Sequence, residues 1–138
     1  MEPGPRRILL VDDEAEIRII ARMALEMVGG FEVRDFGSAE EALAAAAEVR
    51  PDLLLLDVMM PGMDGLQALA RLRRIPATVG TPAIFMTAKV QPAEVAAYEA
   101  LGAIGVIAKP FSPMALPDEV RRLWKRAAEE VSTCAARR

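Results

Sequence analysis

Five short apolar runs, each followed by a longer segment of helical periodicity, constrain the fold of this chain more than any other feature. The runs are Ile8–Val11, Phe31–Phe36, Leu53–Leu56, Ala83–Met86 and Ile104–Ala108. At four to six residues they are too short for ordinary helices. Continuous apolar strands are typical of a sheet that is covered on both faces. We therefore interpret the runs as five buried strands of a parallel sheet.

The segments between the runs carry helix signals. Apolar residues recur at three- and four-residue steps from Glu14 to Val28, and Gly29-Gly30 ends that pattern. Ser38 is a predicted N-cap, with Glu41 completing a capping box, and Asp64 is a second predicted N-cap. The five predicted helices cover residues 14–28, 38–49, 64–76, 92–101 and 112–127, the last opening at Ser112 or Pro113.

Five strand–helix units predict an α/β fold, because right-handed crossovers place helices on both faces of a parallel sheet. The expected architecture is a doubly wound (βα)5 three-layer sandwich. A chain of 138 residues fits one domain of this kind, which we expect to cover residues 1–131. Residues 132–138 form a basic C-terminal tail that is expected to fray.

Composition excludes several classes of protein. The net charge of −3 offers no global basic field for nucleic acid, so no direct DNA binding is expected. The single cysteine, Cys134, cannot form an internal disulfide, and the lack of histidine excludes a His-based relay or zinc site. The apolar runs are far short of the ~20 residues of a membrane span. No signal-peptide pattern is found, and the sequence predicts a soluble cytoplasmic protein without membrane contact.

Polar side chains stand at the carboxyl ends of four predicted strands. The first strand ends in Asp12-Asp13-Glu14, the third in Asp57, the fourth in Thr87 and the fifth in Lys109-Pro110. Ligands of open α/β sheets bind beyond this edge. Each residue alone is typical of a turn, a helix cap or a solvated surface. Their coincidence on four strand ends favours a common site.

The residue types at this edge suit phosphoryl transfer. Clustered carboxylates repel one another unless a cation compensates, and oxygen-rich acidic sites suit Mg²⁺. A lysine supplies a point charge for a phosphoryl oxygen, and a threonine hydroxyl adds a donor. An aspartate can act as the nucleophile and form an aspartyl-phosphate.

The chain resembles the receiver domain of two-component response regulators, including the chemotaxis regulators. The matching stretches are ILLVDDE at 8–14, LLLLDVMMPGMDG at 53–65, FMTAK at 85–89 and IAKPF at 107–111. This resemblance implies a flavodoxin-like sheet of order 2-1-3-4-5. It also implies phosphorelay signal transduction, in which Asp57 accepts a phosphoryl group from the phosphohistidine of a sensor histidine kinase or histidine phosphotransfer protein.

The resemblance implies a role for each residue of the site. Asp13, Asp57 and the backbone carbonyl of Met59 would bind Mg²⁺, or Mn²⁺ as a substitute, and Asp12 would help through water. Lys109 would contact the phosphoryl group, in catalysis with Asp57 and Thr87. The switch residues would be Thr87, which moves, the small Ala88 and position 106, and the Lys109-Pro110 bond would be cis.

One departure concerns the switch. Relatives usually carry Tyr or Phe three residues before the lysine, whereas this chain has Val106. We therefore hypothesise that output passes through the loop 88–93 or through altered dimerisation. The dimer would use the face formed by the fourth helix, the fifth strand and the fifth helix, and the downstream protein target is not given by the sequence.

Three alternatives are distinguished by simple features. A stand-alone receiver or phosphorelay intermediate is the leading interpretation, because little chain follows the last predicted helix. The chain could also be a receiver fragment of a larger hybrid kinase or transcriptional regulator. An aspartate-nucleophile phosphatase would need a second acid at Met59, so an enzyme acting on external substrates is not expected. Catalysis would be limited to the protein's own phosphorylation and dephosphorylation.

Overall fold

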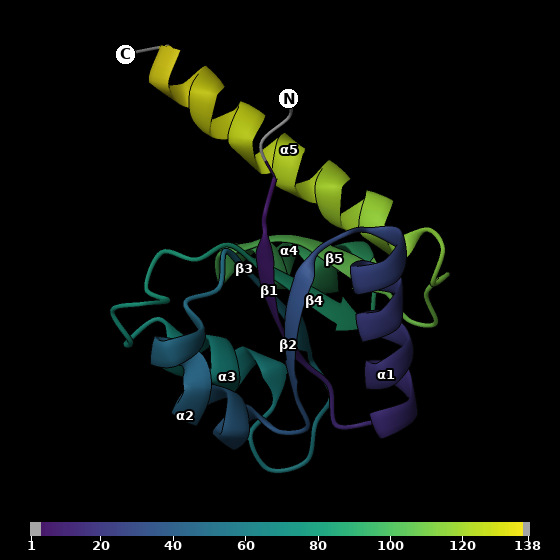
Figure 1. Ribbon diagram of the computed structural model, residues 1–138. Helices are drawn as coiled ribbons and strands as arrows, with labels where there is room; N and C mark the ends of the chain where they lie inside the picture. The colour runs from purple at the N-terminus through teal and green to yellow at the C-terminus, as the bar shows by residue number, and fades with distance from the viewer. Residues whose placement is uncertain (1–3, 137–138) are drawn as a thin grey trace.

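A five-stranded parallel sheet forms the centre of the molecule (Figure 1). The computed structural model describes residues 4–136, with side chains described through residue 130. Its strands are β1 (Arg7–Val11), β2 (Glu32–Phe36), β3 (Leu53–Asp57), β4 (Ala83–Thr87) and β5 (Ala103–Ala108). They lie in the order β2-β1-β3-β4-β5, which confirms the predicted fold class and strand order.

Helices follow each strand, with bounds that differ slightly from the predicted ones. They are α1 (Ala15–Met23), η1 (Ala24–Val28), α2 (Ala39–Val49), α3 (Gly65–Leu72), α4 (Pro92–Ala100) and α5 (Leu116–Ala136). The segment η1 is a π-helical turn that continues α1. The third helix ends at Leu72, because Pro76 has no N–H to donate to the Leu72 carbonyl. That carbonyl accepts instead from the Ile75 N–H and the Thr78 hydroxyl. The last helix begins at Leu116, since the residues after Ser112 first form a tight turn.

Capping explains where two of the helices begin. The Ser38 hydroxyl accepts a hydrogen bond from the backbone N–H of Glu41, so Ser38 is the N-cap as predicted. The Glu41 carboxylate bonds the Ser38 hydroxyl instead of its backbone N–H, so the second half of the expected capping box is absent. Asp64 and Gln67 form the complete box at the start of α3.

Alternate residues of the strands build two hydrophobic cores, one on each face of the sheet. Leu9 and Val11 of β1 lie in the core covered by α2, α3 and α4. Ile8 and Leu10 lie in the opposite core, which α1, η1 and α5 cover. Figure 1 shows α1 across the sheet from α2 and α3. The helices thereby leave the carboxyl edge of the sheet open.

The C-terminal helix is longer than the sequence pattern predicts. It reaches Ala136 and projects beyond the sheet, so most of the segment 132–138 is helical and residues 137 and 138 lie outside the described part (Figure 1). Fraying of its last turns stays a prediction. Among the described residues, no helix combines the length and apolar character needed to cross a membrane.

Candidate functional site

Three carboxylates meet at the carboxyl ends of β1 and β3. The two strands pair in parallel, with Val11 opposite Leu56, so the residues that follow them emerge side by side. Oxygen atoms of Asp12, Asp13 and Asp57 all lie within 4.8 Å of one another. Asp12 and Asp57 are buried, whereas Asp13 is exposed. The acidic cluster predicted from the strand ends is therefore assembled in space.

One lysine crosses from β5 to this cluster. Lys109 Nζ lies 3.1 Å from Asp12 Oδ2 and 3.4 Å from Asp57 Oδ1. It also lies 3.5 Å from Glu14 Oε1. Burial lowers the pKa of Lys109, but the hydrogen bond and charge of Asp12, with the charges of Asp57 and Glu14, outweigh burial and raise it. The ammonium is therefore charged and balances only part of the surrounding negative charge.

Asp57 is the less compensated of the two buried carboxylates, since both oxygens of Asp12 have hydrogen-bond partners. Its side chain is nearly inaccessible, and its Oδ2 atom has no hydrogen-bond partner among the described residues. Burial, and next the charge of Asp12, raise the pKa of Asp57 to about 7, against a smaller opposing effect of Lys109. A buried acceptor without a partner is rare in folded proteins and costs free energy. Such an atom fits a site that receives a cation or an electrophile.

A glycine lets a helix pack directly against the end of β3. Gly65 begins α3, and its N–H donates to the carbonyl of Val58 at 3.0 Å. A Cβ atom at this position would overlap the carbonyl oxygen of Asp57. The absence of a side chain therefore holds the start of α3 against the backbone that presents the Asp57 carboxylate. The Lys109-Pro110 peptide bond, directly after β5, is cis.

The side chains of the remaining predicted residues make no hydrogen bond or ion pair with the cluster in the described part of the chain. Thr87 is buried at the end of β4, and its hydroxyl accepts a hydrogen bond from the N–H of Lys89 at 3.0 Å. Ala88 and the side chain of Met59 are exposed. Val106 is partly buried and lies opposite Phe85 in the β4–β5 ladder. The structure thus brings together Asp12, Asp13, Asp57 and Lys109, while Thr87 bonds its own loop.

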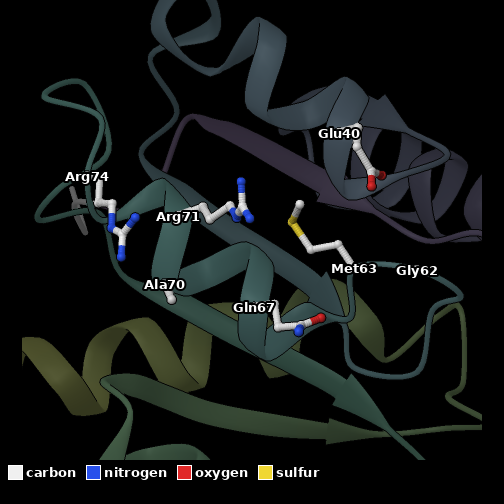
Figure 2. Close-up of a pocket in the computed structure, with 7 residues that line it drawn as sticks. All are labelled: Glu40, Gly62, Met63, Gln67, Ala70, Arg71 and Arg74. Atoms are coloured by element: carbon white, nitrogen blue, oxygen red, sulfur yellow. The ribbon is translucent and has the colours of Figure 1, made fainter.

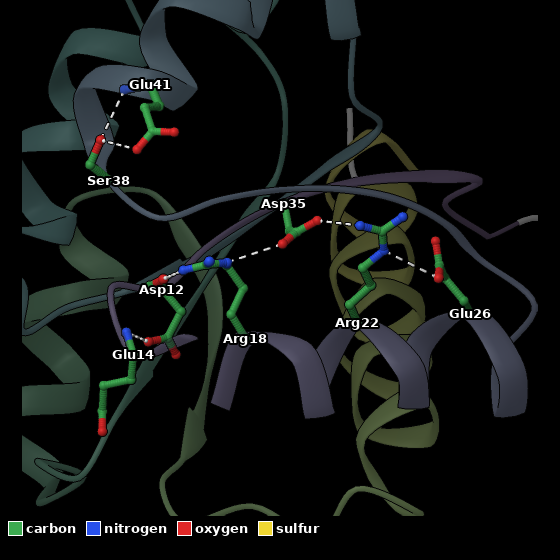
Figure 3. A network of polar contacts seen from close by, with 8 residues as sticks. All are labelled: Asp12, Glu14, Arg18, Arg22, Glu26, Asp35, Ser38 and Glu41. Carbon is green, nitrogen blue, oxygen red and sulfur yellow. Dashed lines mark hydrogen bonds and ion pairs between the residues drawn. The ribbon is translucent and has the colours of Figure 1, made fainter. Parts of the chain in front are cut away.

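Arg18 is a residue of this region that sequence reasoning missed. Its Nη1 donates to the backbone carbonyl of Asp12 at 2.8 Å, and its Nε donates to Asp35 Oδ2 at 3.0 Å (Figure 3). The signal in the sequence is weak. Arg18 stands three residues before the buried Ala21 on α1, but this spacing does not distinguish an arginine turned inward from a solvated one.

A separate groove of about 460 Å³ lies between α2 and α3 (Figure 2). It is lined by Glu40, Gly62, Met63, Gln67, Ala70, Arg71 and Arg74. None of these residues belongs to the carboxylate cluster, and the side chains that line it are of mixed charge. The groove therefore supplies no part of the chemistry at the sheet edge.

Comparison with protein families agrees with this geometry. The family model of the response regulator receiver domain matches residues 8–121. The chain belongs to the response-regulator receiver family. Proteins of this family are signalling domains of two-component systems, they bind Mg²⁺ at an acidic pocket and they interact with histidine kinases. The Asp12–Asp13–Asp57 cluster fits such a pocket, because it offers oxygen ligands to a hard cation.

The individual proteins similar to this chain include curated regulators and a chemotaxis protein of known structure. The phosphate regulon transcriptional regulatory protein PhoB of Pseudomonas aeruginosa is 39% identical over 121 residues, 88% of this chain and 52% of its own length. The DNA-binding response regulator MtrA of Mycobacterium tuberculosis is 38% identical over 130 residues, 94% of this chain and 55% of MtrA. The chemotaxis protein CheY4 of Vibrio cholerae superposes with a TM-score of 0.79 at 32% identity, covering 86% of this chain and 98% of CheY4.

The chain spans about half the length of the curated regulators it matches. The expectation that it does not bind DNA receives no support from them, since MtrA is named as a DNA-binding response regulator. The structure describes only the receiver part of such proteins.

Proposed function

We propose that Asp57 accepts a phosphoryl group from the phosphohistidine of a sensor histidine kinase or a histidine phosphotransfer protein. The observation that carries this proposal is the buried Asp57 carboxylate, with an unpartnered oxygen beside two further aspartates and Lys109. A nucleophile needs a free lone pair and a site with little water. Asp57 Oδ2 is buried and accepts no hydrogen bond from the described residues, so it meets both conditions.

The proposed metal is Mg²⁺, for which Mn²⁺ can substitute. Asp13, Asp57 and the backbone carbonyl of Met59 would hold it directly, and Asp12 would hold it through water. When bound, the cation neutralises charge on the carboxylates and on the phosphoryl oxygens. The raised pKa of Asp57 supports this role, because uncompensated negative charge at a buried site is what a divalent cation relieves.

The reaction moves one phosphoryl group between two side chains. A carboxylate oxygen of Asp57 forms the new O–P bond while the P–N bond of the donor phosphohistidine breaks, and the electron pair leaves with the imidazole. Lys109, already 3.4 Å from Asp57 Oδ1, would donate to a phosphoryl oxygen. Thr87 would exchange its bond with Lys89 for one to the same group. Hydrolysis of the acyl phosphate by water would later restore Asp57.

Output requires a change that a partner can recognise. The loop 88–93 follows Thr87 directly, so a movement of the Thr87 hydroxyl releases the Lys89 N–H and displaces this loop. The face formed by α4, β5 and α5 is the proposed dimerisation surface, and it contains Val106 in place of a larger aromatic side chain. A downstream protein would bind this region or the dimer.

Incubation with acetyl phosphate and MgCl2, followed by intact-protein mass spectrometry, tests the phosphorylation. We expect one phosphoryl group on the parent protein and none after Asp57→Asn or in excess EDTA. Asp52→Asn is the matched control, because Asp52 lies at the other end of β3, where it accepts from the N–H groups of Arg6 and Arg7. An unmodified parent protein, or an Asp57→Asn variant that is still modified, would refute the proposal.

The same preparation tests whether catalysis is confined to the protein itself. The exposed methionine Met59 stands two residues after Asp57, where a phosphatase of the aspartate type would need a second acid. We expect no multiple turnover of p-nitrophenyl phosphate under conditions that phosphorylate Asp57. Sustained product release above the amount of protein would contradict this expectation.

A further inference from the structure

A series of polar contacts connects Asp12 of the acidic cluster to Asp35 on the outer strand β2, and continues along α1 to Glu26 of η1 (Figure 3). Arg18 of α1 is its central member, with a side chain that is 21% exposed. Its guanidinium donates to the Asp12 carbonyl at 2.8 Å and to Asp35 at 3.0 Å. Within the described part of the chain, Arg18 contacts no carboxylate of the acidic cluster, so we expect any effect on that cluster to pass through the backbone of Asp12.

Arg18 donates its hydrogen bond to the peptide group that joins Asp12 to Asp13. The other polar groups of Asp12 are engaged as well: its N–H donates to Phe36, Oδ1 accepts from the N–H of Glu14 and Oδ2 accepts from Lys109. Only the carbonyl of Asp12 is held by a side chain from α1. Because a peptide is planar, fixing this carbonyl also fixes the direction in which the chain enters Asp13.

The carboxylate partner of Arg18 is itself fixed, and space is left for the Arg18 guanidinium. Arg22, one turn further along α1, donates to the second oxygen of Asp35 at 2.7 Å and lies 3.3 Å from Glu26. A Cβ atom on Gly37 would lie only 3.0 Å from Arg18 Nη1, so the lack of a side chain there leaves room for the guanidinium. A planar guanidinium with donors in divergent directions can bridge a carbonyl and a carboxylate, whereas a lysine ammonium at one point cannot reach both in the same way.

We propose that Arg18 is a positioning residue of the Mg²⁺ site, which orients the Asp12–Asp13 peptide through its bond to the Asp12 carbonyl. This inference rests on the proposed function, because it assumes that Asp13 is a metal ligand. Groups behind the ligands of a metal often change affinity by roughly 10–100-fold when they are removed. For one hydrogen bond to one ligand-bearing peptide, the lower end of that range is expected.

The sign of the effect separates positioning from simple electrostatics. Removing a positive charge beside an acidic site favours cation binding by Coulomb's law. Loss of positioning has the opposite effect, since Asp13 then samples directions that do not meet the cation. Arg18→Gln should therefore bind Mg²⁺ more weakly if Arg18 positions the peptide, and as tightly or more tightly if Arg18 acts only through its charge.

Isothermal titration of the full chain with MgCl2 decides between them, with Arg22→Gln as the matched control. Arg22 shares Asp35 with Arg18, carries the same charge and makes no bond to Asp12. We expect the Kd for Mg²⁺ to rise about tenfold in Arg18→Gln, by an intermediate factor in Arg18→Lys, and less than twofold in Arg22→Gln. Urea unfolding should show similar losses of stability in the two glutamine variants.

Equal Mg²⁺ affinities of the parent and Arg18→Gln would overturn the positioning role, as would equal weakening in Arg18→Gln and Arg22→Gln. Arg18→Lys decides the matter if the glutamine variant does not fold: parent-like affinity in Arg18→Lys means that charge suffices. Failure of the parent protein to bind Mg²⁺ would instead overturn the proposed function, and the positioning role with it. The amide shift of Asp13 in the metal-free protein provides a second readout, which should change in Arg18→Gln and not in Arg22→Gln.

Discussion

The carboxyl ends of β1 and β3 differ from those of β4 and β5 in how much of their chemistry is already assembled. At β1 and β3, three carboxylates lie within 4.8 Å of one another, and α3 packs directly on the Asp57 backbone through Gly65. At β4, the Thr87 hydroxyl is bonded to Lys89 in its own loop, and the loop residues that follow are exposed. One region already holds together the groups that the proposed phosphorylation requires. In the other, Thr87 would have to exchange a local hydrogen bond before it could take its proposed part.

Gly65→Ala is expected to produce the largest effect on the assembled region. The added methyl group would overlap the carbonyl oxygen of Asp57, so α3 or the end of β3 must shift. Overpacking of this kind destabilises by about 1–3 kcal/mol. Displacement of the nucleophile by about 1 Å can cost roughly 100-fold in rate. The rate of phosphorylation by acetyl phosphate should therefore fall at least about tenfold, measured by mass spectrometry over time.

Two other glycines serve as controls for this prediction. A Cβ atom at Gly105 would meet the side chain of Leu123 on α5, so Gly105→Ala should also lose stability but retain the phosphorylation rate. Gly80 has no heavy atom within 4 Å of the added carbon, and Gly80→Ala should change neither property. A Gly65→Ala protein that is phosphorylated as fast as Gly105→Ala would show that close packing of α3 does not position Asp57.

Asp57→Asn should reveal the free energy that the uncompensated carboxylate costs. The pKa of Asp57 is about 7 in the folded protein and near its ordinary value of 3.8 in the unfolded chain. Between these values the folded state retains a proton that the unfolded state has released, so stability falls as the pH rises through this window. Without metal, Asp57→Asn should be more stable than the parent at pH 8, by on the order of 2 kcal/mol.

Urea unfolding in metal-free buffer at about pH 4 and pH 8 measures this difference. The advantage of Asp57→Asn should be small at the lower pH, because the parent carboxyl is protonated in the folded state and still partly protonated in the unfolded chain, so little of the pH-dependent cost has accumulated. Saturating MgCl2 at pH 8 should reduce the advantage, because the cation stabilises the ionised parent. A constant difference between the two proteins at both pH values would mean that Lys109 already compensates Asp57.

Much of the assembled region could be predicted from the sequence. The carboxyl ends of parallel strands share one edge, so Asp12, Asp57 and Lys109 had to converge once the strands were recognised. Arg18 was not predicted as part of the site, and Gly65 was expected only to fit the tight loop after Asp57, not to hold α3 against the Asp57 backbone. Their roles depend on which way a helix turns and how closely it approaches a strand, and neither is encoded in local spacing. The π-turn η1 was missed for a similar reason, because five residues are too few to separate its period from that of an α-helix.

Thr87→Ala should separate the two regions functionally. The variant keeps the three carboxylates and Lys109, so phosphorylation should stay within about fivefold of the parent, since one neutral hydrogen bond contributes about 1 kcal/mol. The loop response should shrink, because no hydroxyl then leaves Lys89 for the phosphoryl group. Beryllofluoride with Mg²⁺ can act as the phosphoryl mimic, and backbone amide shifts of residues 88–93 report the response.

In the parent, the mimic should shift these amides clearly, and in Thr87→Ala by less than half as much. Thr81→Ala, at the other end of the same strand, is the control and should respond as the parent does. Identical loop shifts with and without the mimic in the parent would refute transmission through this loop. Altered dimerisation through the face of α4, β5 and α5 would then remain as the way in which a chain with Val106 transmits phosphorylation to a partner.

Arg50→Gly is expected to have the smallest effect, at a place remote from both regions. Arg50 ends α2 in the left-handed conformation, with φ of 50°, just before β3 begins. A side chain in this conformation costs roughly 1 kcal/mol relative to glycine, although glycine also loses more entropy on folding. The net gain in stability should be about 0.5 kcal/mol, seen as a higher urea midpoint. Because Arg50 lies toward the amino end of β3, the phosphorylation rate and the loop shifts should stay at parent values. A change in either would mean that the carboxyl edge is sensitive to stability as a whole, and that the contrast between its two regions is not local.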